Sequence, residues 1–452
     1  MSPTSAILSQ AQDFLTRHPD VEAIDIVLTD AHGIGRGKII RRHELEGLFT
    51  TGRGMPASLF AQDVEGDDVQ GALATQNDGG GDSRCWPVPG TLGLLPATGR
   101  GVVLVTMYDA NGNPHPGDPR HAMLANIARA QAAGLTPMGA MELEFYLVDR
   151  DRDAAGQMQP ARYALTARRN RASNTMSVDE LDEMSPFFDA VYAGAKSLNL
   201  PLETLISEYA PSQYELTLRY RNLARAADDI ILAKRLIRAT ARRFGFEACF
   251  MAKPFGHLSG SGMHLHLSLA DLAGANLFAD HGDALSPVML QAIGGIRAAM
   301  ADSMLVLAPF LNSWRRFAST VYSPASNTWG VEDRMVAVRI PSGAPQTRHF
   351  EQRVAGVDAN PYLVAAVTLG TALDGITGQM QAGAPGMAGA SDHPPLPRTW
   401  QEAIHAFDRS IPMRRILGPA FHAGFAAIKQ AEHDQLAVEV TEAEWRLYGF
   451  VV

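Results

Sequence analysis

The stretch SGSGMHLHLSL, residues 259–269, has the alternation of a half-buried β-strand and carries two histidines on its polar side. Side chains two apart share one face of a strand, so His264, His266 and Ser268 lie together. Met263 and the leucines form the opposite, apolar face. The imidazoles could bind a metal ion, although a lone histidine in such a strand is more often an ordinary core or surface residue.

A second stretch, MELEF at residues 141–145, has the same period of two. It places Glu142 and Glu144 side by side on one face of a strand. Two adjacent carboxylates in apolar surroundings repel each other and are costly to desolvate unless a cation lies between them. Taken alone, the pair also fits a half-exposed strand with a solvated acidic face.

Further glutamates follow in ETLISEYAPSQYEL, residues 203–216, and in FEQR, residues 350–353. The combination of many glutamates with one or two histidines predicts a hard divalent cation, Mg²⁺ or Mn²⁺. Zinc is disfavoured because the sequence has no cysteine cluster. Mg²⁺ in turn suggests chemistry on nucleotide phosphates, for which arginines in NSWRRF (312–317) and VEDRMVAVRIP (331–341) could supply charge. Each arginine taken singly is more simply a surface residue.

The composition is that of a globular protein. Among 452 residues, 46% are hydrophobic and 19% are charged, and the net charge of -9 offers no basic face for nucleic acid. Cys85 and Cys249 are too few for a disulfide framework, which favours the cytoplasm. The start of the chain lacks a secretory signal, and the apolar segment 289–310 carries Arg297 and Asp302, so we expect a buried helix and no membrane span.

Strand and helix patterns alternate without a regular βαβ order, which predicts an α+β fold. The Gly- and Pro-rich segment NGNPHPGDP, residues 111–119, indicates a domain boundary near residue 115. We therefore expect a domain at 1–115 and a catalytic domain at 116–452. The expected elements are a β-hairpin at 21–42, strands at 136–149 and 248–255, a helix capped by Ser177 and Glu180 that runs to Leu200, helices at 120–134, 222–245, 288–309 and 361–376, and an exposed loop at 382–397.

Six motifs in order over nearly the whole chain resemble those of the glutamine synthetase superfamily. They are MELEF (141–145), EYAPSQYE (208–215), KPFGHLSGSGMHLHLSL (253–269), NSWRRF (312–317), DRMVAVRIP (333–341) and FEQRVAGVDANPYL (350–363). The resemblance implies a small β-grasp-like N-terminal domain followed by a large catalytic domain. It also implies an ATP-dependent ligase that forms a C–N bond through γ-glutamyl phosphate.

The resemblance further implies a role for each matching position. One metal ion would be bound by Glu144, Glu208 and Glu215, and a second by Glu142, His264 and Glu351. ATP would contact Glu203, Tyr220, His266 and Ser268. Glutamate would be bound by Gly260, Arg316 and Arg353, with the two arginines holding its carboxylates or closing over the site. Arg334, Arg339 and Arg316 would be catalytic, Arg334 and Arg339 by neutralising the transferred phosphoryl group. By the same resemblance we expect two or more Mg²⁺ or Mn²⁺ ions per site and a homododecamer of two stacked hexameric rings.

The sequence departs from ammonia-using members at the places where they bind ammonium. GMPASLFAQD, residues 54–63, lacks the expected aspartate, and FASTVYSPASNTWG, residues 317–330, lacks the expected glutamate. Ser259 and His349 also replace residues that are common in the family. These changes resemble the branch that ligates glutamate to polyamines, so the expected substrates are ATP, glutamate and a primary amine such as putrescine.

Three alternatives remain open at this point: a glutamine synthetase with a rearranged ammonium site, a ligase for a monoalkyl or aryl amine, and a non-catalytic nucleotide-binding relative. Met55, Phe60 and Trp329 are candidates for an apolar amine pocket. The base that deprotonates the amine is not assigned. Its candidates by sequence proximity are Asp63, Glu65, Glu332 and Asp333.

Overall fold

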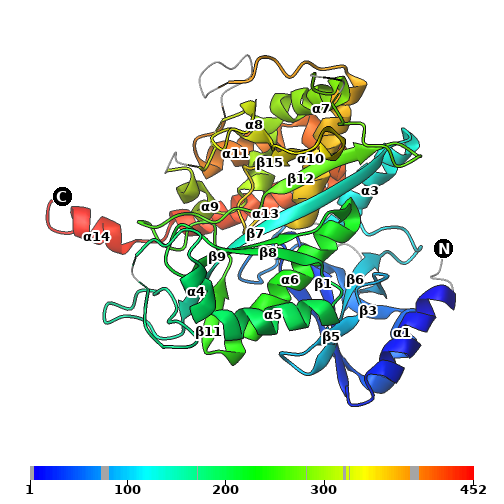
Figure 1. The fold of residues 1–452 in the computed structure, drawn as a ribbon, viewed down its shortest axis with the longest axis vertical. Coiled ribbons are helices and arrows are strands. Elements are labelled where there is room, and N and C mark those ends of the chain that lie inside the picture. The colour runs from blue at the N-terminus through cyan, green and yellow to red at the C-terminus, as the bar shows by residue number, and fades with distance from the viewer. Residues whose placement is uncertain are drawn as a thin grey trace.

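The protein is represented by a computed structural model that describes residues 5–72, 81–170, 172–280, 282, 284–318, 322–324, 326–386 and 396–452. Two β-sheets organise the chain, a smaller one near the N-terminus and a larger one that helices cover (Figure 1). The mixture confirms the α+β class.

The first sheet has the order β2-β1-β6-β4-β3, with β5 also paired to β6. Strands β1 (Ala23–Thr29) and β2 (Gly35–Arg41) form the antiparallel hairpin that the sequence predicts, and β1 also runs parallel to β6 (Arg100–Tyr108). This mixed, grasp-like sheet packs against two helices around its own apolar core. The remaining elements of this part are α1 (Ser5–Arg17), α2 (Leu45–Thr51), β3 (Arg53–Pro56), β4 (Asp82–Pro87) and β5 (Gly93–Leu95).

The second sheet has the order β13-β14-β15-β12-β7-β9-β8 and is built on the long strand β7 (Thr136–Asp149). That strand crosses the molecule in Figure 1 and pairs antiparallel with β12 and β9. The other strands are β8 (Leu202–Ser207), β9 (Gln213–Leu218), β10 (Arg221–Asn222), β11 (Phe246–Cys249), β12 (Leu265–Ala270), β13 (Trp329–Val331), β14 (Val338–Ile340) and β15 (Phe350–Gln352).

Helices cover the apolar side of this sheet. Both α3 (Pro119–Ala132) and α6 (Leu223–Arg243) contact β7, and α10 (Pro361–Thr377), which is buried over most of its length, packs against both of them. All three match predicted helices. The other helices are α4 (Val178–Glu183), α5 (Ser185–Ser197), α7 (Pro287–Ala298), α8 (Met300–Leu307), α9 (Leu311–Arg316), α11 (Trp400–Asp408), α12 (Ile411–Leu417), α13 (Pro419–Ala437) and α14 (Glu442–Tyr448).

Some predicted elements are shorter or broken. The strand expected at 248–255 ends at Cys249, where the chain turns into the loop that precedes the histidines. The helix expected at 288–309 is two helices that meet at Ala299 with a bend of 75°. Ser177 does cap a helix, since its Oγ accepts from the Glu180 N–H at 3.2 Å, but that helix breaks at Met184 before α5 begins.

Among the described helices, none is by itself long and apolar enough to cross a membrane; only the bent α7–α8 pair passes such a test. Residues 387–395 of the predicted exposed loop, and residues 319–321 and 325 of the segment after α9, lie outside the described residues.

Buried polar contacts join the two parts of the chain. Asn360, the N-cap of α10, donates its side-chain amide to the Asp30 carbonyl at 2.9 Å in the turn after β1. His32, in the same turn, places its Nε2 2.5 Å from Oε1 of Glu432 on α13. Lys429, also on α13, donates its Nζ to Glu432 Oε2 at 2.8 Å. These contacts fix the N-terminal sheet against the helices that support the larger one.

Candidate active site

The register of the second sheet places the predicted polar residues on one face. Glu144 of β7 lies opposite Glu215 of β9, and on the other side His266 of β12 lies opposite Glu351 of β15. Arg339 of β14 is in turn opposite Glu351. A row of ionisable side chains therefore crosses five adjacent strands.

The alternate residues of the same strands form the core. Met141, Leu143, Leu265, Leu267 and Phe350 are all essentially inaccessible to solvent and belong to the large apolar cluster beneath the sheet. Because side chains alternate strictly between faces, burying these residues forces the glutamates and histidines onto the other face. The packing of the core thus positions the site.

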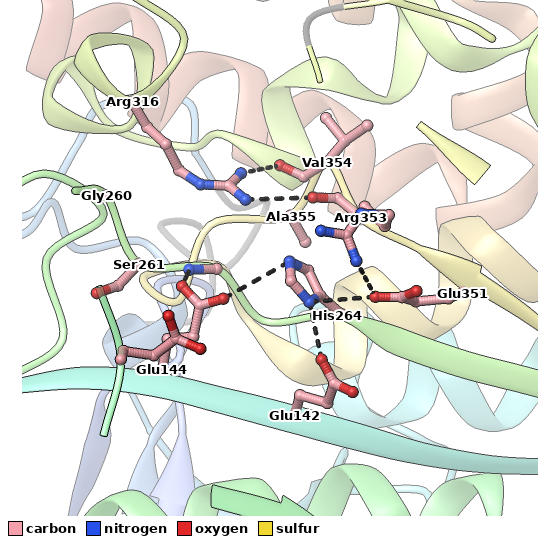
Figure 2. A network of polar contacts seen from close by, with 12 residues as sticks. Glu142, Glu144, Gly260, Ser261, His264, Arg316, Glu351, Arg353, Val354 and Ala355 are labelled. Atoms are coloured by element: carbon pink, nitrogen blue, oxygen red, sulfur yellow. Dashed lines mark hydrogen bonds and ion pairs between the residues drawn. The ribbon is translucent and has the colours of Figure 1, made fainter. Parts of the chain in front are cut away.

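Glu142 lies at the centre of this polar face, between both histidines. His264 Nδ1 lies 2.9 Å from Glu142 Oε2, and His266 Nε2 lies 2.9 Å from Oε1 (Figure 2 draws the first contact). Burial alone would raise the pKa of Glu142, but the hydrogen bonds from His264 and His266 hold it well below its ordinary value. Glu142 is therefore ionised.

Glu351 completes this group. Its Oε1 lies 3.3 Å from His264 Nδ1, so Nδ1 and one oxygen from each of Glu142 and Glu351 face one another (Figure 2). Ligand atoms of Glu142, His266 and Glu351 also lie within 4.8 Å of one another. Both histidines thus adjoin the predicted metal group, although the resemblance gives that role to His264 alone.

The hydrogen bonds around His266 define its protonation state. His349 Nδ1 lies 2.9 Å from the Thr347 carbonyl, which can only accept, so His349 Nε2 accepts from His266 Nδ1 at 3.0 Å. His266 Nε2 must also donate, because it faces the ionised Glu142. Burial would lower the pKa of His266, but the hydrogen bond with Glu142 raises it, consistent with an imidazolium. Without a metal ion, protons thus supply part of the positive charge that Glu142 and Glu351 require.

The second carboxylate group consists of Glu144, Glu208 and Glu215. Burial, with repulsion from Glu142 and Glu144, raises the pKa of Glu215 to about 10. Burial and repulsion from Glu144 raise the pKa of Glu208 to about 7. Without a bound cation, burial and mutual repulsion prevent these carboxylates from all being ionised at once. A divalent cation between them would offset that repulsion.

The donor set fits such ions. Oxygen ligands dominate, as Mg²⁺ and Mn²⁺ prefer, and a histidine is available beside them. His264 Nε2 is buried without a hydrogen-bond partner in the described part of the chain and faces Glu144 Oε1 at 3.9 Å. An unpaired ring nitrogen directed at a carboxylate is an arrangement that a cation would complete.

The predicted arginines occupy different positions around these carboxylates. Arg339 donates to Glu351 Oε2 at 3.0 Å, and Arg353 forms an ion pair with Oε1 of the same residue. Arg316, at the end of α9, is buried and donates to the Val354 carbonyl at 2.8 Å and the Arg353 carbonyl at 3.3 Å (Figure 2). Arg334 is exposed, and its charge acts on Glu208.

The glycines of the opening stretch allow this close packing. A Cβ on Gly260 would lie 2.7 Å from Arg316 Cγ and 2.9 Å from the Ala252 carbonyl oxygen. A Cβ on Gly262 would lie 2.7 Å from His264 Nε2. The Gly262 N–H donates to Glu144 Oε2 at 2.6 Å. The two glycines let the backbone pass between the arginine and the histidine.

The predicted ATP contacts are more spread out. Ser268 follows His266 on the same face of β12. Glu203 is exposed on β8, where Arg219 donates to it at 2.7 Å, and Tyr220 is exposed just beyond β9. No contact between Glu203 or Tyr220 and the carboxylate groups is observed among the described residues.

The expected apolar amine pocket was wrong for the single chain. Met55 and Phe60 are buried in the core of the first sheet, and Trp329 is buried in the large core, where its indole N–H donates to the Gly383 carbonyl at 3.2 Å. Of the candidate bases, Asp63 is buried and accepts N–H bonds from its own turn. Glu332 binds the Ser342 N–H and lies 3.4 Å from Arg339.

Sequence reasoning missed two supporting residues. Asn312 on α9 forms paired hydrogen bonds with the backbone of Lys253, each 2.9 Å long, and so ties the helix of Arg316 to the glycine-containing loop. The signal was its place in NSWRRF, four residues before Arg316. His349 was noted only as a replacement, although it is bonded directly to His266.

Comparison with known proteins agrees with this geometry. The chain matches the glutamine synthetase catalytic domain family over residues 116–448. It is 36% identical to gamma-glutamylputrescine synthetase PuuA of Escherichia coli K12 over 98% of this chain and 95% of that protein. It is 30% identical to glutamate–isopropylamine ligase of a Pseudomonas species, covering 94% of each. A solved structure of ligand-free GmaS superposes with a TM-score of 0.82 at 27% identity, covering 96% of this chain and 98% of that one.

Proposed function

The chain belongs to the glutamine synthetase family, and on that premise we propose that it ligates the γ-carboxylate of glutamate to a primary amine with conversion of ATP to ADP and phosphate. The observation that carries this proposal is the full-length similarity to two relatives named for amine ligation. We further propose putrescine or another polyamine as the amine, since the more similar of the two is named for putrescine. A monoalkyl or aryl amine is the second candidate, favoured by the similarity to the isopropylamine ligase.

The reaction has two steps. In the first, a γ-carboxylate oxygen of glutamate attacks the γ-phosphorus of ATP, and the bond to the ADP oxygen breaks. In the second, a neutral amine attacks the carbonyl carbon of γ-glutamyl phosphate, phosphate leaves, and the amine nitrogen loses a proton. Activation is needed because a carboxylate and an amine do not condense usefully in water, so the site must orient both and exclude water.

We assign the chain's residues to these steps as follows. Bound Mg²⁺ or Mn²⁺ would offset the negative charge of the phosphates. For two or more ions we assign Glu144, Glu208 and Glu215 to one, and Glu142, His264 and Glu351 to another. Arg334 and Arg339 would stabilise the transferred phosphoryl group, and Arg316, Arg353 and Gly260 would hold glutamate. Glu203, Tyr220, His266 and Ser268 would contact ATP.

The contacts of three of these arginines support the assignments. Arg339 and Arg353 are held by Glu351, one on each carboxylate oxygen, so their guanidinium groups are oriented before any substrate binds. Such preorganised charge costs no reorganisation when charge develops in the transition state. Arg316 is held by two backbone carbonyls in the same way.

We also propose a division near residue 115 and a homododecamer of two hexameric rings. The first sheet ends at Tyr108 and the first strand of the second begins at Thr136, which supports the division. A contact between subunits is supported by the C-terminal segment 438–452, which projects at the left of Figure 1 and exposes Trp445, Leu447, Tyr448, Phe450, Val451 and Val452. Isolated seven-residue helices such as α14 are unstable in water, so we expect a second copy to cover it. We also place the enzyme in the cytoplasm, in keeping with a sequence that has only two cysteines.

A phosphate-release assay with ATP, glutamate and Mg²⁺ or Mn²⁺ tests the function. Ammonium, methylamine, isopropylamine, ethanolamine, aniline and putrescine are compared, and each product is identified by mass spectrometry. We expect γ-glutamyl amides and a higher kcat/KM for at least one organic amine than for ammonium. A preference for ammonium with glutamine as product would contradict the proposal. For the assembly, light scattering of the chain without residues 438–452 should give a smaller particle than the intact chain; an unchanged mass would contradict the proposed contact.

A further inference from the structure

The facing residues Glu144 and Glu215 are followed along β7 and β9 by a second pair on the same side of the sheet. Tyr146 of β7 lies opposite Gln213 of β9 in the antiparallel register. Side chains two apart share one face of a strand, so Tyr146 follows Glu144, and Gln213 precedes Glu215, on the polar face. Both residues are buried. The polar face therefore continues from a pair of carboxylates into a pair of neutral hydrogen-bond donors.

Both donors reach the same glycine-containing loop, residues 259–262. The Tyr146 hydroxyl donates to the Ser259 carbonyl at 2.7 Å, and Gln213 Nε2 donates to the Gly260 carbonyl at 2.9 Å. Gln213 Nε2 also donates to Ser261 Oγ at 3.2 Å. Two adjacent strands thus bind two consecutive carbonyls of the loop.

The turn before β9 sets the orientation of the Gln213 amide. Its Oε1 accepts from the Ala210 N–H at 3.2 Å, which leaves the NH₂ group to face the loop. A carbonyl can only accept, so the contact with Gly260 requires a donor. Neither an ionised carboxylate nor an apolar side chain of the same length could make this contact.

These bonds also direct the backbone N–H of Gly260. A trans peptide points its carbonyl and its N–H in opposite directions, so the bond to the Ser259 carbonyl turns the Gly260 N–H away from the Tyr146 hydroxyl. The backbone of the next residue, Ser261, is bonded at its N–H to the Ala252 carbonyl and at its carbonyl to the N–H of residue 357. No acceptor for the Gly260 N–H is observed in the described part of the chain. The loop therefore offers one free backbone donor.

That donor belongs to the residue that packs on Arg316. A Cβ on Gly260 would lie 2.7 Å from Arg316 Cγ, so a shift of the loop changes this contact directly. We propose that Tyr146 and Gln213 are positioning residues that hold Gly260 against Arg316 and thereby set the affinity for glutamate. The inference rests on the proposed function, which assigns Gly260 and Arg316 to glutamate, and deepens it by naming the side chains that place them.

The size of the effect follows from the hydrogen bonds that are lost. One neutral hydrogen bond changes an equilibrium by roughly 2- to 13-fold, and Gln213 makes two bonds to the loop whereas Tyr146 makes one. We expect the KM for glutamate to rise on the order of ten-fold or more in Gln213→Met and about five-fold in Tyr146→Phe. The loop would bind glutamate equally in the ground state and the transition state, so kcat should change by less than about three-fold.

The test measures kcat, the KM for glutamate, the KM for ATP and the melting temperature of the intact protein and of three variants, Gln213→Met, Tyr146→Phe and Tyr362→Phe. Methionine matches the length of glutamine but has no donor. Tyr362 is a matched control, because its hydroxyl is also buried and donates to Asp228 Oδ1 at 2.8 Å on the helical side of the sheet. We expect the KM for glutamate to rise in the first two variants only, and the KM for ATP to stay unchanged in all three.

Two results would overturn the inference. An unchanged KM for glutamate in Gln213→Met and Tyr146→Phe, even with a lower melting temperature, would show that the contacts only stabilise the loop. An equal rise in the KM for ATP would show a general disturbance of the site. The two variants remove different donors, so misfolding of one leaves the other as the test. Failure of the proposed function is distinguishable, because the unsubstituted protein would then prefer ammonium, and the same comparison of glutamate KM can be made with ammonium.

Discussion

Binding of a divalent cation should release protons, because the metal-free site retains them on carboxylates that must ionise to become ligands. The pKa of Glu215 is raised to about 10 and that of Glu208 to about 7. The two carboxylates interact, so the protons belong to the group rather than to one residue. At pH 8 the group therefore retains about one proton, and at pH 6 about two.

The magnitude follows from these values. Each displaced proton makes the association constant for the metal ion rise about ten-fold per pH unit, or about 1.4 kcal/mol. We therefore expect a slope of about one in log K between pH 7 and pH 10, becoming steeper below pH 7 as the second proton is displaced. The sign is fixed, because the folded-state pKa values of both groups are raised: protonation opposes metal binding, and affinity falls with falling pH.

Titration calorimetry with Mn²⁺ at pH 8, in buffers of different ionisation enthalpy, measures the number of protons released. The intact protein should release about one proton per ion in this group. Glu215→Gln should abolish that release and weaken binding, whereas Glu247→Gln, at an exposed carboxylate of β11 that pairs with Arg242, should leave both unchanged. Zero release by the intact protein, or equal release by Glu215→Gln, would refute the reasoning.

The remaining predictions concern other contacts of the site and the fold. Gly260→Ala should raise the KM for glutamate by at least ten-fold in steady-state assays, since its Cβ would lie 2.7 Å from Arg316 Cγ; an unchanged KM would contradict the close packing. Arg339→Lys should lower kcat on the order of 100-fold with little change in melting temperature, because lysine cannot donate to Glu351 and Glu332 at once as the planar guanidinium does, while the charge remains. Burial would raise the pKa of Glu432, but the charge of Lys429 helps to lower it to about 2. The ionised carboxylate therefore stabilises the fold by about 3 kcal/mol above pH 4.5, and this contribution is lost as the pH falls through 2. Denaturation of Glu432→Gln should thus show a deficit at pH 7 that shrinks towards pH 2, and a pH-independent deficit would contradict it.

Local sequence patterns predicted the strands and faces that carry the site. The period of two in MELEF and in the opening stretch correctly assigns Glu142, Glu144, His264 and His266 to polar faces, because burial of the alternate leucines permits no other orientation. The pairing of those strands was beyond such reasoning. That Glu144 lies opposite Glu215, for example, depends on a register between distant segments.

The errors have a similar origin. Met55 and Phe60 were placed at an amine pocket from their sequence neighbourhood alone, whereas their apolar side chains fill the core of the first sheet. The helix expected at 288–309 breaks at Ala299, where no proline or strong stop signal marks the bend. The positive φ of +57° at Met176 was not predicted either, because left-handed backbone at a methionine has no signature in the sequence.

The central claim, that glutamate is activated as an acyl phosphate before the amine attacks, is tested most directly with glutamate labelled with ¹⁸O in its γ-carboxylate. Turnover with ATP and the preferred amine should place one ¹⁸O atom in each molecule of inorganic phosphate, with ADP as the nucleotide product. Unlabelled phosphate, or AMP in place of ADP, would contradict the account.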